Sequence, residues 1–389
     1  MCCSKTTTTT PSPPIPTTPA STFAIKMSTM TATLRMLLIF IILGQMRLVT
    51  STIVPEDGVF IITMVADPDG RTDMFLQLDG HDAGFVAYAE EYVIAGLTVG
   101  LYLKAGTRVG ARFTGDPEGA TNYGMALASY IKDSFVTVRS NGYSSSQSNA
   151  VHFHHQYLSG WTWKSIPTTS TFRAKHNGIY WVSARPDCGS GDVSLNVGGG
   201  LFNVFCNGDK AISASGAFYL LAGEALQLTF HSGGTLQGGT SFSFVYLEGN
   251  QRTYLNNYQH AAYTAWADRT GTIYKNETLS FDGRIATDYG WLYNPTYRTW
   301  TIGTAGSYIV SLRGDPDSST LNVHLYKNDD TKYVFAWYNE GGSKSGQAGI
   351  FDFASGDKLF MISPNERYLG PETFMSIALL WTESGYAFI

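Results

Sequence analysis

Three histidines lie close together around Phe153 and form the densest set of candidate metal ligands in the sequence. His152 and His154 alternate along an expected strand, so both imidazoles would lie on one face. Two such imidazoles could share a metal ion or titrate near pH 6. A metal site needs further ligands, which the sequence does not place, so a solvated strand face is the simpler interpretation.

Pairs of aspartates flank two prolines, and their carboxylates are the hard oxygen ligands that calcium prefers. Asp315 and Asp317 form one pair, and Asp67 and Asp69 form the other. Aspartate beside proline also caps turns, because its side chain can bond the backbone two residues further on. Turn capping explains the pairs more simply, and Asp315 and Asp317 remain the calcium candidates.

Signatures of catalysis are absent from the sequence. It contains no G-x-S-x-G, no phosphate-binding P-loop, no H-E-x-x-H and no C-x-x-C. We therefore predict that the chain is not an enzyme and holds no cofactor. The formal net charge is −5 and no Lys/Arg-rich run occurs, which argues against a nucleic-acid partner.

The elements that would position any site are short strands. The chain is 14% aromatic, only 15% charged and contains 41 glycines, a composition that favours strands and tight turns over helices. One pattern occurs three times: a glycine opens an apolar strand that leads to a proline turn, a second glycine turns between two strands, and an alternating strand closes the copy. The opening glycines are Gly58, Gly178 and Gly306, and the turn glycines are Gly106, Gly223 and Gly356.

The spacing of these copies suits compact β-sandwich domains rather than a solenoid. We predict an all-β chain with a partial domain at 52–133 and complete domains at 134–250 and 251–389. The first copy lacks the strands that precede the opening glycine in the others. Because an unpartnered sheet edge invites aggregation, either another segment completes this copy or part of the sequence is missing.

The N-terminal region reads as a targeting segment. Residues 1–26 are rich in Thr and Pro and are expected to be disordered. Residues 27–51 combine a basic flank, a short apolar run and small residues before Thr52, which is typical of a secretory signal peptide. The chain is therefore expected to be secreted. Arg47 is unusual in a signal peptide and leaves an uncleaved signal anchor as the alternative.

Two further features fit an extracellular protein. Cys188 and Cys206 are the two cysteines outside the N-terminal region, and an even pair in a secreted chain predicts one disulfide, with two buried free thiols as the alternative. Asn276-Glu-Thr278 is a sequon, so we expect Asn276 to be glycosylated.

The repeats resemble the globular head domain of the complement C1q family, which shares its jelly roll with tumour necrosis factor ligands. Leu292-Tyr-Asn-Pro-Thr-Tyr-Arg-Thr-Trp300 followed by Gly306-Ser-Tyr308 is the phrase most similar to that family. Leu279-Ser-Phe281-Asp resembles the family's preceding strand, Ser355-Gly356-Asp357 its turn, and Thr373-Phe374-Met-Ser376 its closing strand. The resemblance covers nearly all of the third copy, most of the second and the back half of the first.

The resemblance implies tandem C1q/TNF-like jelly-roll sandwiches and a non-catalytic, lectin-like role. The ligand would be a carbohydrate, a microbial surface, as in innate immunity, or a protein, and the alternative is a membrane-anchored tumour necrosis factor-like signalling ligand. It also places Cys206 where some members carry a disulfide, and it slightly favours calcium binding. Family heads associate as trimers, so we expect either a trimer of chains or a pseudo-trimer within one chain. No collagen-like Gly-X-Y stalk is present.

Overall fold

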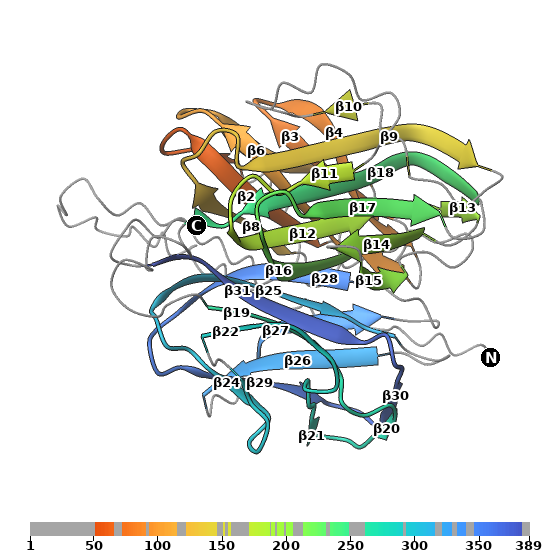
Figure 1. Ribbon diagram of the computed structural model, residues 1–389, viewed down its shortest axis with the longest axis vertical. Coiled ribbons are helices and arrows are strands. Elements are labelled where there is room, and N and C mark those ends of the chain that lie inside the picture. The colour runs from red at the N-terminus through yellow and green to blue at the C-terminus, as the bar shows by residue number, and fades with distance from the viewer. Residues whose placement is uncertain are drawn as a thin grey trace, which may run out of the picture. The chain divides into compact units, whose positions relative to one another are not determined.

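The computed structural model describes residues 51–65, 72–90, 93–114, 122–145, 151, 155–156, 171–186, 188–190, 193–197, 200–204, 213–230, 234–248, 261–290, 293–315, 321–328, 333–339 and 346–382. Over these residues the chain is all-β, as the sequence predicts, and each strand pair is antiparallel (Figure 1). Among the same residues, no helix has the length and apolar character needed to cross a membrane.

The strands form three groups along the chain, and no described sheet combines strands of two groups. The first group makes a sheet in the order β6-β2-β8 and a second in the order β1-β7-β3-β4-β5. Its strands are β1 (Thr52–Ile53), β2 (Gly58–Val65), β3 (Thr72–Leu78), β4 (His81–Glu90), β5 (Val93–Ala95), β6 (Leu97–Leu103), β7 (Arg108–Thr114) and β8 (Asn122–Ser129).

The second group repeats this arrangement with one sheet ordered β10-β9-β18-β12-β16, in which β13 also pairs with β18, and another ordered β11-β17-β14-β15. Its strands are β9 (Phe135–Ser145), β10 (His155–Gln156), β11 (Thr171–Arg173), β12 (Gly178–Arg185), β13 (Cys188–Ser190), β14 (Val193–Val197), β15 (Gly200–Val204), β16 (Ala214–Leu220), β17 (Ala225–Phe230) and β18 (Gly234–Tyr246).

The third group has an inner sheet ordered β22-β19-β31-β25-β28, an outer sheet ordered β23-β24-β29-β26-β27 with β21 also on β29, and the pair β20-β30. Its strands are β19 (Ala262–Trp266), β20 (Gly271–Ile273), β21 (Glu277–Thr278), β22 (Ile285–Tyr289), β23 (Tyr293–Asn294), β24 (Thr299–Thr301), β25 (Gly306–Arg313), β26 (Leu321–Lys327), β27 (Tyr333–Asn339), β28 (Gly346–Phe353), β29 (Lys358–Ser363), β30 (Arg367–Leu369) and β31 (Phe374–Thr382).

The repeated phrases of the sequence correspond to repeated strands. β2, β12 and β25 begin at the predicted opening glycines and end before the proline turns. The turn glycines Gly106, Gly223 and Gly356 have φ values of 87°, 92° and 90°, a left-handed conformation that favours glycine. One local prediction is wrong: residues 279–282 do not form a strand, although the Leu279 amide donates to the Met361 carbonyl of β29 at 2.9 Å and Leu279 and Phe281 are buried.

The front ends of the groups differ among the described residues. In the second group, β18 pairs with β12 on one side and β9 on the other. In the third, β31 pairs with both β25 and β19. Within the described residues, β8 of the first group pairs with β2 and with no further strand. The predicted segments 1–26 and 27–51 lie outside the described residues, except for Ser51.

Apolar side chains between the two sheets of each group form three separate cores. Each core also takes a side chain from a neighbouring group: Trp381 enters the first core, Trp266 and Phe374 enter the second, and Val65 enters the third. A fourth cluster is lined by the sheets that contain β2, β12 and β25. We call these the inner sheets of the three groups, and the sheets ordered β1-β7-β3-β4-β5, β11-β17-β14-β15 and β23-β24-β29-β26-β27 their outer sheets. Burial of apolar surface therefore holds the groups to one another as well as holding each together.

Candidate ligand-binding site

The outer sheet of the third group presents aromatic side chains on its solvent face. In β26, buried residues alternate with half-buried ones, so Asn322, His324 and Tyr326 point away from the core. The same alternation in β29 turns Phe360 and Ile362 outward. The register places Tyr326 opposite Phe360 and His324 opposite Ile362, so these side chains are direct neighbours on one face.

Four rings form a continuous surface, which we call the ring cluster: His324, Tyr326, Tyr333 and Phe360. Tyr326 stacks on Phe360 with ring centroids 5.5 Å apart and planes 9° apart. The centroid of His324 lies 4.2 Å from that of Tyr333, and Tyr326 meets Tyr333 edge-on at 6.4 Å. Tyr333, at the start of β27, is 50% exposed. The cluster is therefore packed enough to be ordered and open enough to touch a ligand.

Burial affects the protonation of the ring cluster. Desolvation lowers the pKa of His324 below its ordinary value, because the half-buried ring loses water that would solvate its charged form. His324 is therefore neutral at neutral pH, with one nitrogen able to donate and the other able to accept a hydrogen bond. The cluster carries no charge of its own under those conditions.

A polar turn fixes the register that brings Tyr326 and Phe360 together. Asn328, which follows β26, donates its side-chain amide to Asp357 Oδ1 at 2.9 Å and accepts the Lys358 amide at 2.9 Å. Asp357 Oδ2 accepts the Ala354 amide at 2.8 Å. Burial alone raises the pKa of Asp357, but the hydrogen bonds from Asn328 and Ala354 and the charge of Lys327 outweigh it and lower that pKa. The carboxylate thus joins the end of β26 to the start of β29.

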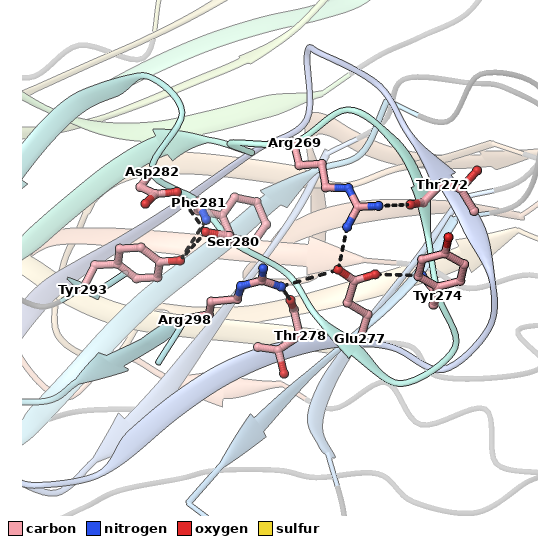
Figure 2. Close-up of polar contacts among 10 residues, drawn as sticks. All are labelled: Arg269, Thr272, Tyr274, Glu277, Thr278, Ser280, Phe281, Asp282, Tyr293 and Arg298. Atoms are coloured by element: carbon pink, nitrogen blue, oxygen red, sulfur yellow. Dashed lines mark hydrogen bonds and ion pairs between the residues drawn. The ribbon is translucent and has the colours of Figure 1, made fainter. Parts of the chain in front are cut away.

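Charged residues border the same sheet along β21, on the side of β29 away from β26. Glu277 accepts hydrogen bonds from Arg269 Nη1 at 3.1 Å and from Arg298 Nη1 at 3.5 Å, as Figure 2 shows. Arg298 also donates to the carbonyl oxygen of Thr278 at 2.7 Å, and Glu277 accepts the Tyr274 amide at 2.9 Å. We call Arg269, Glu277 and Arg298 the arginine edge. Its contacts join the β20–β21 turn to Arg298 in the β23–β24 turn.

The predicted glycosylation residue lies in this turn. Asn276 is exposed and adopts a φ of 62°, a conformation that asparagine tolerates better than most residues. Its backbone amide donates to the carbonyl oxygen of Ser363 at 2.7 Å, and this bond fixes the backbone that carries the side chain. The position is thus compatible with a glycan beside the sheet that carries the ring cluster, and the modification stays a prediction.

Buried aromatic residues support the sheet from below. Tyr293 donates or accepts a hydrogen bond with Ser280 at 3.1 Å and accepts the Phe281 amide at 3.0 Å, as Figure 2 shows. Its ring lies 4.9 Å from that of Trp300, which is fully buried. Tyr293 and Trp300 are paired across the β23–β24 hairpin, and Arg298 in its turn has a φ of 52°.

The outer sheets of the other two groups share this register but present different chemistry. Where the third group has Tyr326 opposite Phe360, the first has Gln77 opposite Gly110 and the second has Asn196 opposite Gln227. In the second group the Asn196 amide bonds the Thr229 hydroxyl at 3.1 Å. Among the described residues of these three equivalent positions, the paired rings are a property of the third group.

The sequence-based site residues do not gather at this face. Asp315 is buried, and its Oδ2 accepts the Glu372 amide at 3.0 Å, a bond to a distant segment rather than to the backbone two residues further on. Asp317 lies outside the described residues. In the described part of the chain, no group of three or more His, Cys, Asp or Glu side chains could hold a metal ion. Calcium binding by Asp315 and Asp317 therefore stays a prediction.

The remaining candidates are incompletely described. Cys188 begins β13, but Cys206 lies outside the described residues, so the disulfide stays a prediction. His152 and His154 also lie outside them, and His155 begins the short strand β10. Sequence reasoning missed the ring cluster. Its signal was the alternation in Leu321-Asn-Val-His-Leu-Tyr326, which places His324 and Tyr326 on the same face.

Comparison with known proteins does not assign the chain to a family. No family model and no curated protein matches it. Among solved structures, it is similar to the globular domain of zebrafish complement 1qA protein, with 11% identity and a TM-score of 0.27, covering 31% of this chain and 98% of that one. It is also similar to the CBM22-1-CBM22-2 tandem domain of Paenibacillus barcinonensis Xyn10C, with 12% identity and a TM-score of 0.17, covering 62% and 93%.

Proposed function

We propose that this chain is a secreted, non-catalytic recognition protein that binds carbohydrate through the ring cluster. The observation that carries the proposal is the set of four rings on the solvent face of the third group's outer sheet, with Tyr333 half exposed. Aromatic side chains that only fill a core would be buried rather than exposed to solvent. Scattered exposed apolar residues are common, but four contiguous rings on one rigid sheet indicate a binding surface.

The chemistry of the cluster suits a sugar ring. A pyranose has one face of C–H groups, which packs on an aromatic ring, and hydroxyl groups at its rim, which need polar partners. The hydroxyls of Tyr326 and Tyr333 and the neutral imidazole of His324 would supply those partners beside the stacking faces. Because the rings stand on two paired strands and an adjoining third, binding would need little ordering of the protein.

Absence of catalysis is part of the proposal and is supported by the lack of catalytic motifs in the sequence. Secretion is supported by the signal-like segment at 27–51. Sequencing the N-terminus of the protein recovered from the culture medium of producing cells tests this part. A start near Thr52 agrees with cleavage and secretion, whereas retention of the apolar run in a membrane fraction contradicts it.

A glycan array tests the binding proposal. The wild-type protein should bind a defined set of oligosaccharides, and Tyr333→Ala should lose that signal. Tyr297→Ala provides the matched control, because Tyr297 is 73% exposed and lies in the β23–β24 turn, outside the ring cluster. Equal loss with both variants, or no wild-type signal on a broad array, contradicts carbohydrate binding by the cluster.

A further inference from the structure

The inner sheets of the three groups meet in one buried apolar cluster. Its members come from the central strands β2, β12 and β25 and from the strands beside them. They are Val59, Ile61, Ala126, Ala128, Phe135, Ile179, Trp181, Ala217, Val245, Leu247, Ala262, Ile309, Ala348, Ile350, Ala378 and Leu380. Three contact zones radiate from this cluster, one between each pair of groups, and we call them seams.

The seam between the first and second groups is a network of hydroxyl groups on a glycine. Ser243 Oγ accepts the amide of Gly100 at 2.8 Å, and Thr137 Oγ1 donates to the Gly100 carbonyl at 2.5 Å. Thr137 and Ser243 bond one another at 2.7 Å. A Cβ on Gly100 would lie 2.1 Å from a methyl carbon of Val245, so this seam requires glycine.

The seam between the second and third groups repeats the same network. Ser376 Oγ accepts the amide of Ala217 at 2.9 Å, and Thr264 Oγ1 donates to the Ala217 carbonyl at 2.8 Å. Thr264 and Ser376 bond one another, and Thr287 donates to the same carbonyl at 2.8 Å. A small residue bonded by a serine and a threonine hydroxyl therefore occurs in both of these seams, and Thr287 adds a third hydroxyl to the second of them.

In the seam between the third and first groups, the equivalent described positions carry no hydroxyl network and the residue sizes are reversed, while the Gly96 amide donates to the carbonyl oxygen of Gly346 at 3.3 Å. Ile350 occupies the place that Gly100 and Ala217 hold in the other seams, at the same distance along the chain from its turn glycine. Gly124 occupies the place of Ser243 and Ser376, opposite a hydroxyl residue of the central strand in each group.

At this third seam, a Cβ on Gly124 would lie 3.3 Å from Cβ of Ile350. Gly124 would also place that Cβ 2.9 Å from Thr63 Oγ1, which has no hydrogen-bond partner among the described residues. The strand that carries Thr137 in the second group and Thr264 in the third has no described counterpart beside β8. Among the described residues, Ile350 therefore fills the room beside Gly124 that a serine hydroxyl and a further strand occupy in the other two seams.

We propose that the three strand groups close into a pseudo-trimer within one chain, and that the pairing of Ile350 with Gly124 determines which groups can be neighbours. The hydroxyl seams join groups that the chain links directly, whereas the third seam joins its two ends. Only non-covalent contact closes the arrangement there, so this seam is where a second copy of the chain would otherwise bind.

The packing of mismatched seams explains why the groups do not pair with the wrong neighbours. If Ile350 faced Ser243 and Thr137, its side chain would displace their hydroxyl network and leave buried polar groups unpaired. If Gly100 faced Gly124, the contact would contain a void with no side chain on either side. Correct and incorrect neighbours thus differ by both packing and hydrogen bonding, which is how specific interfaces reject wrong partners.

Light scattering on the whole chain tests the first half of the proposal. The expected result is the mass of one chain across a wide concentration range. A trimeric mass at all concentrations would overturn it, because the inner-sheet surfaces would then serve contacts between chains. The measurement needs no ligand, so its failure is distinguishable from a failure of carbohydrate binding.

A size exchange at the third seam tests the second half. Gly124→Val should open the seam, with hydrogen exchange of β8 and β28 amides rising by about tenfold or more and concentration-dependent oligomers appearing. Ile350→Ala in the same chain should restore slow exchange and the monomer, because it returns the lost room. Ile350→Ala as a single change tests the same seam without adding volume, and it should raise exchange in the same two strands.

The hydroxyl seams provide the control. Exchange of β6 and β16 amides, at Gly100 and Ala217, should change by less than about twofold in these variants. A Gly124→Val protein that remains monomeric with unchanged exchange in β8 and β28 would overturn the assignment, as would uniform loosening of all three seams. If Gly124→Val does not fold, the same readout on Ile350→Ala decides.

Discussion

Tyr326 and Phe360 lie on adjacent strands, with ring planes 9° apart and centroids separated by 5.5 Å on the solvent face of the third group. Their strands are held in register by Asn328 and Asp357, which bond each other at 2.9 Å just past the rings. The stack therefore rests on the strand register, which the buried residues that alternate with the rings and this polar contact both support. A binding surface on such a sheet is set before a ligand arrives.

The stacked pair predicts the effect of Phe360→Leu. Leucine keeps most of the apolar volume but removes the ring that stacks on Tyr326. Binding of the best oligosaccharide from the array should weaken by about tenfold, which corresponds to roughly 1.4 kcal/mol. Stability should fall by less than about 1.5 kcal/mol, since the swap is close in volume. Titration calorimetry and urea unfolding measure the two quantities.

Equivalent positions in the other groups supply controls for that variant. Gln77→Ala and Asn196→Ala change residues that take the place of Tyr326 in the first and second groups. Neither should alter binding by more than about twofold, because those faces lack paired rings. Comparable weakening by all three variants would show that the effect is not specific to the ring cluster.

Asp357 predicts a pH dependence of stability. Hydrogen bonds and Lys327 lower the pKa of Asp357 despite its burial, so its contribution is present above the unfolded value of about 3.9 and is lost as pH falls through the folded value. Asp357→Asn should destabilise the protein at pH 7 by about 1–3 kcal/mol. Its deficit should shrink below about pH 4, where wild type loses the same contribution. Urea unfolding at pH 7 and pH 3 checks this, and a constant deficit contradicts it.

Trp300 predicts a difference between two core substitutions. The ring is fully buried, so Trp300→Ala should cost about 3–5 kcal/mol through the cavity it leaves. Its Nε1 has no hydrogen-bond partner among the described residues, so Trp300→Phe removes an unsatisfied donor along with the volume. The phenylalanine variant should therefore lose less than about 2 kcal/mol. Equal losses in denaturant unfolding would contradict the account.

Glycosylation of Asn276 has a matched pair of variants. Thr278→Ser preserves the sequon, whereas Thr278→Ala removes it, and both keep the backbone carbonyl that accepts Arg298. In protein secreted by eukaryotic cells, glycosidase treatment should reduce the mass of wild type and Thr278→Ser but not of Thr278→Ala. An unchanged wild-type mass contradicts the modification.

The sequence predicts local features well because its repeats recur in each group. The opening strands and the glycine turns at Gly106, Gly223 and Gly356 are recognisable from residue patterns. The ring cluster depends on pairing across strands distant in the sequence, from Tyr326 to Phe360. Alternation shows that each ring faces outward, but only the register shows that they touch.

Candidates based on single residue types fared differently. Asp315 is a calcium candidate by residue type alone; it is buried and its carboxylate accepts the Glu372 amide, and calcium binding stays a prediction. The sequence alone also does not show that Gly124 is small and Ile350 large compared with the equivalent residues of the other groups. Neither residue is unusual for a strand. The meaning of this size difference arises only where two groups meet.

Titration of one oligosaccharide, the strongest binder on the array, into wild type, Tyr333→Ala and Tyr297→Ala tests the central claim most directly. The account predicts that Tyr333→Ala binds at least about tenfold more weakly, while Tyr297→Ala binds like wild type and both variants unfold at the wild-type urea concentration. Wild-type affinity in Tyr333→Ala would contradict carbohydrate binding by the ring cluster.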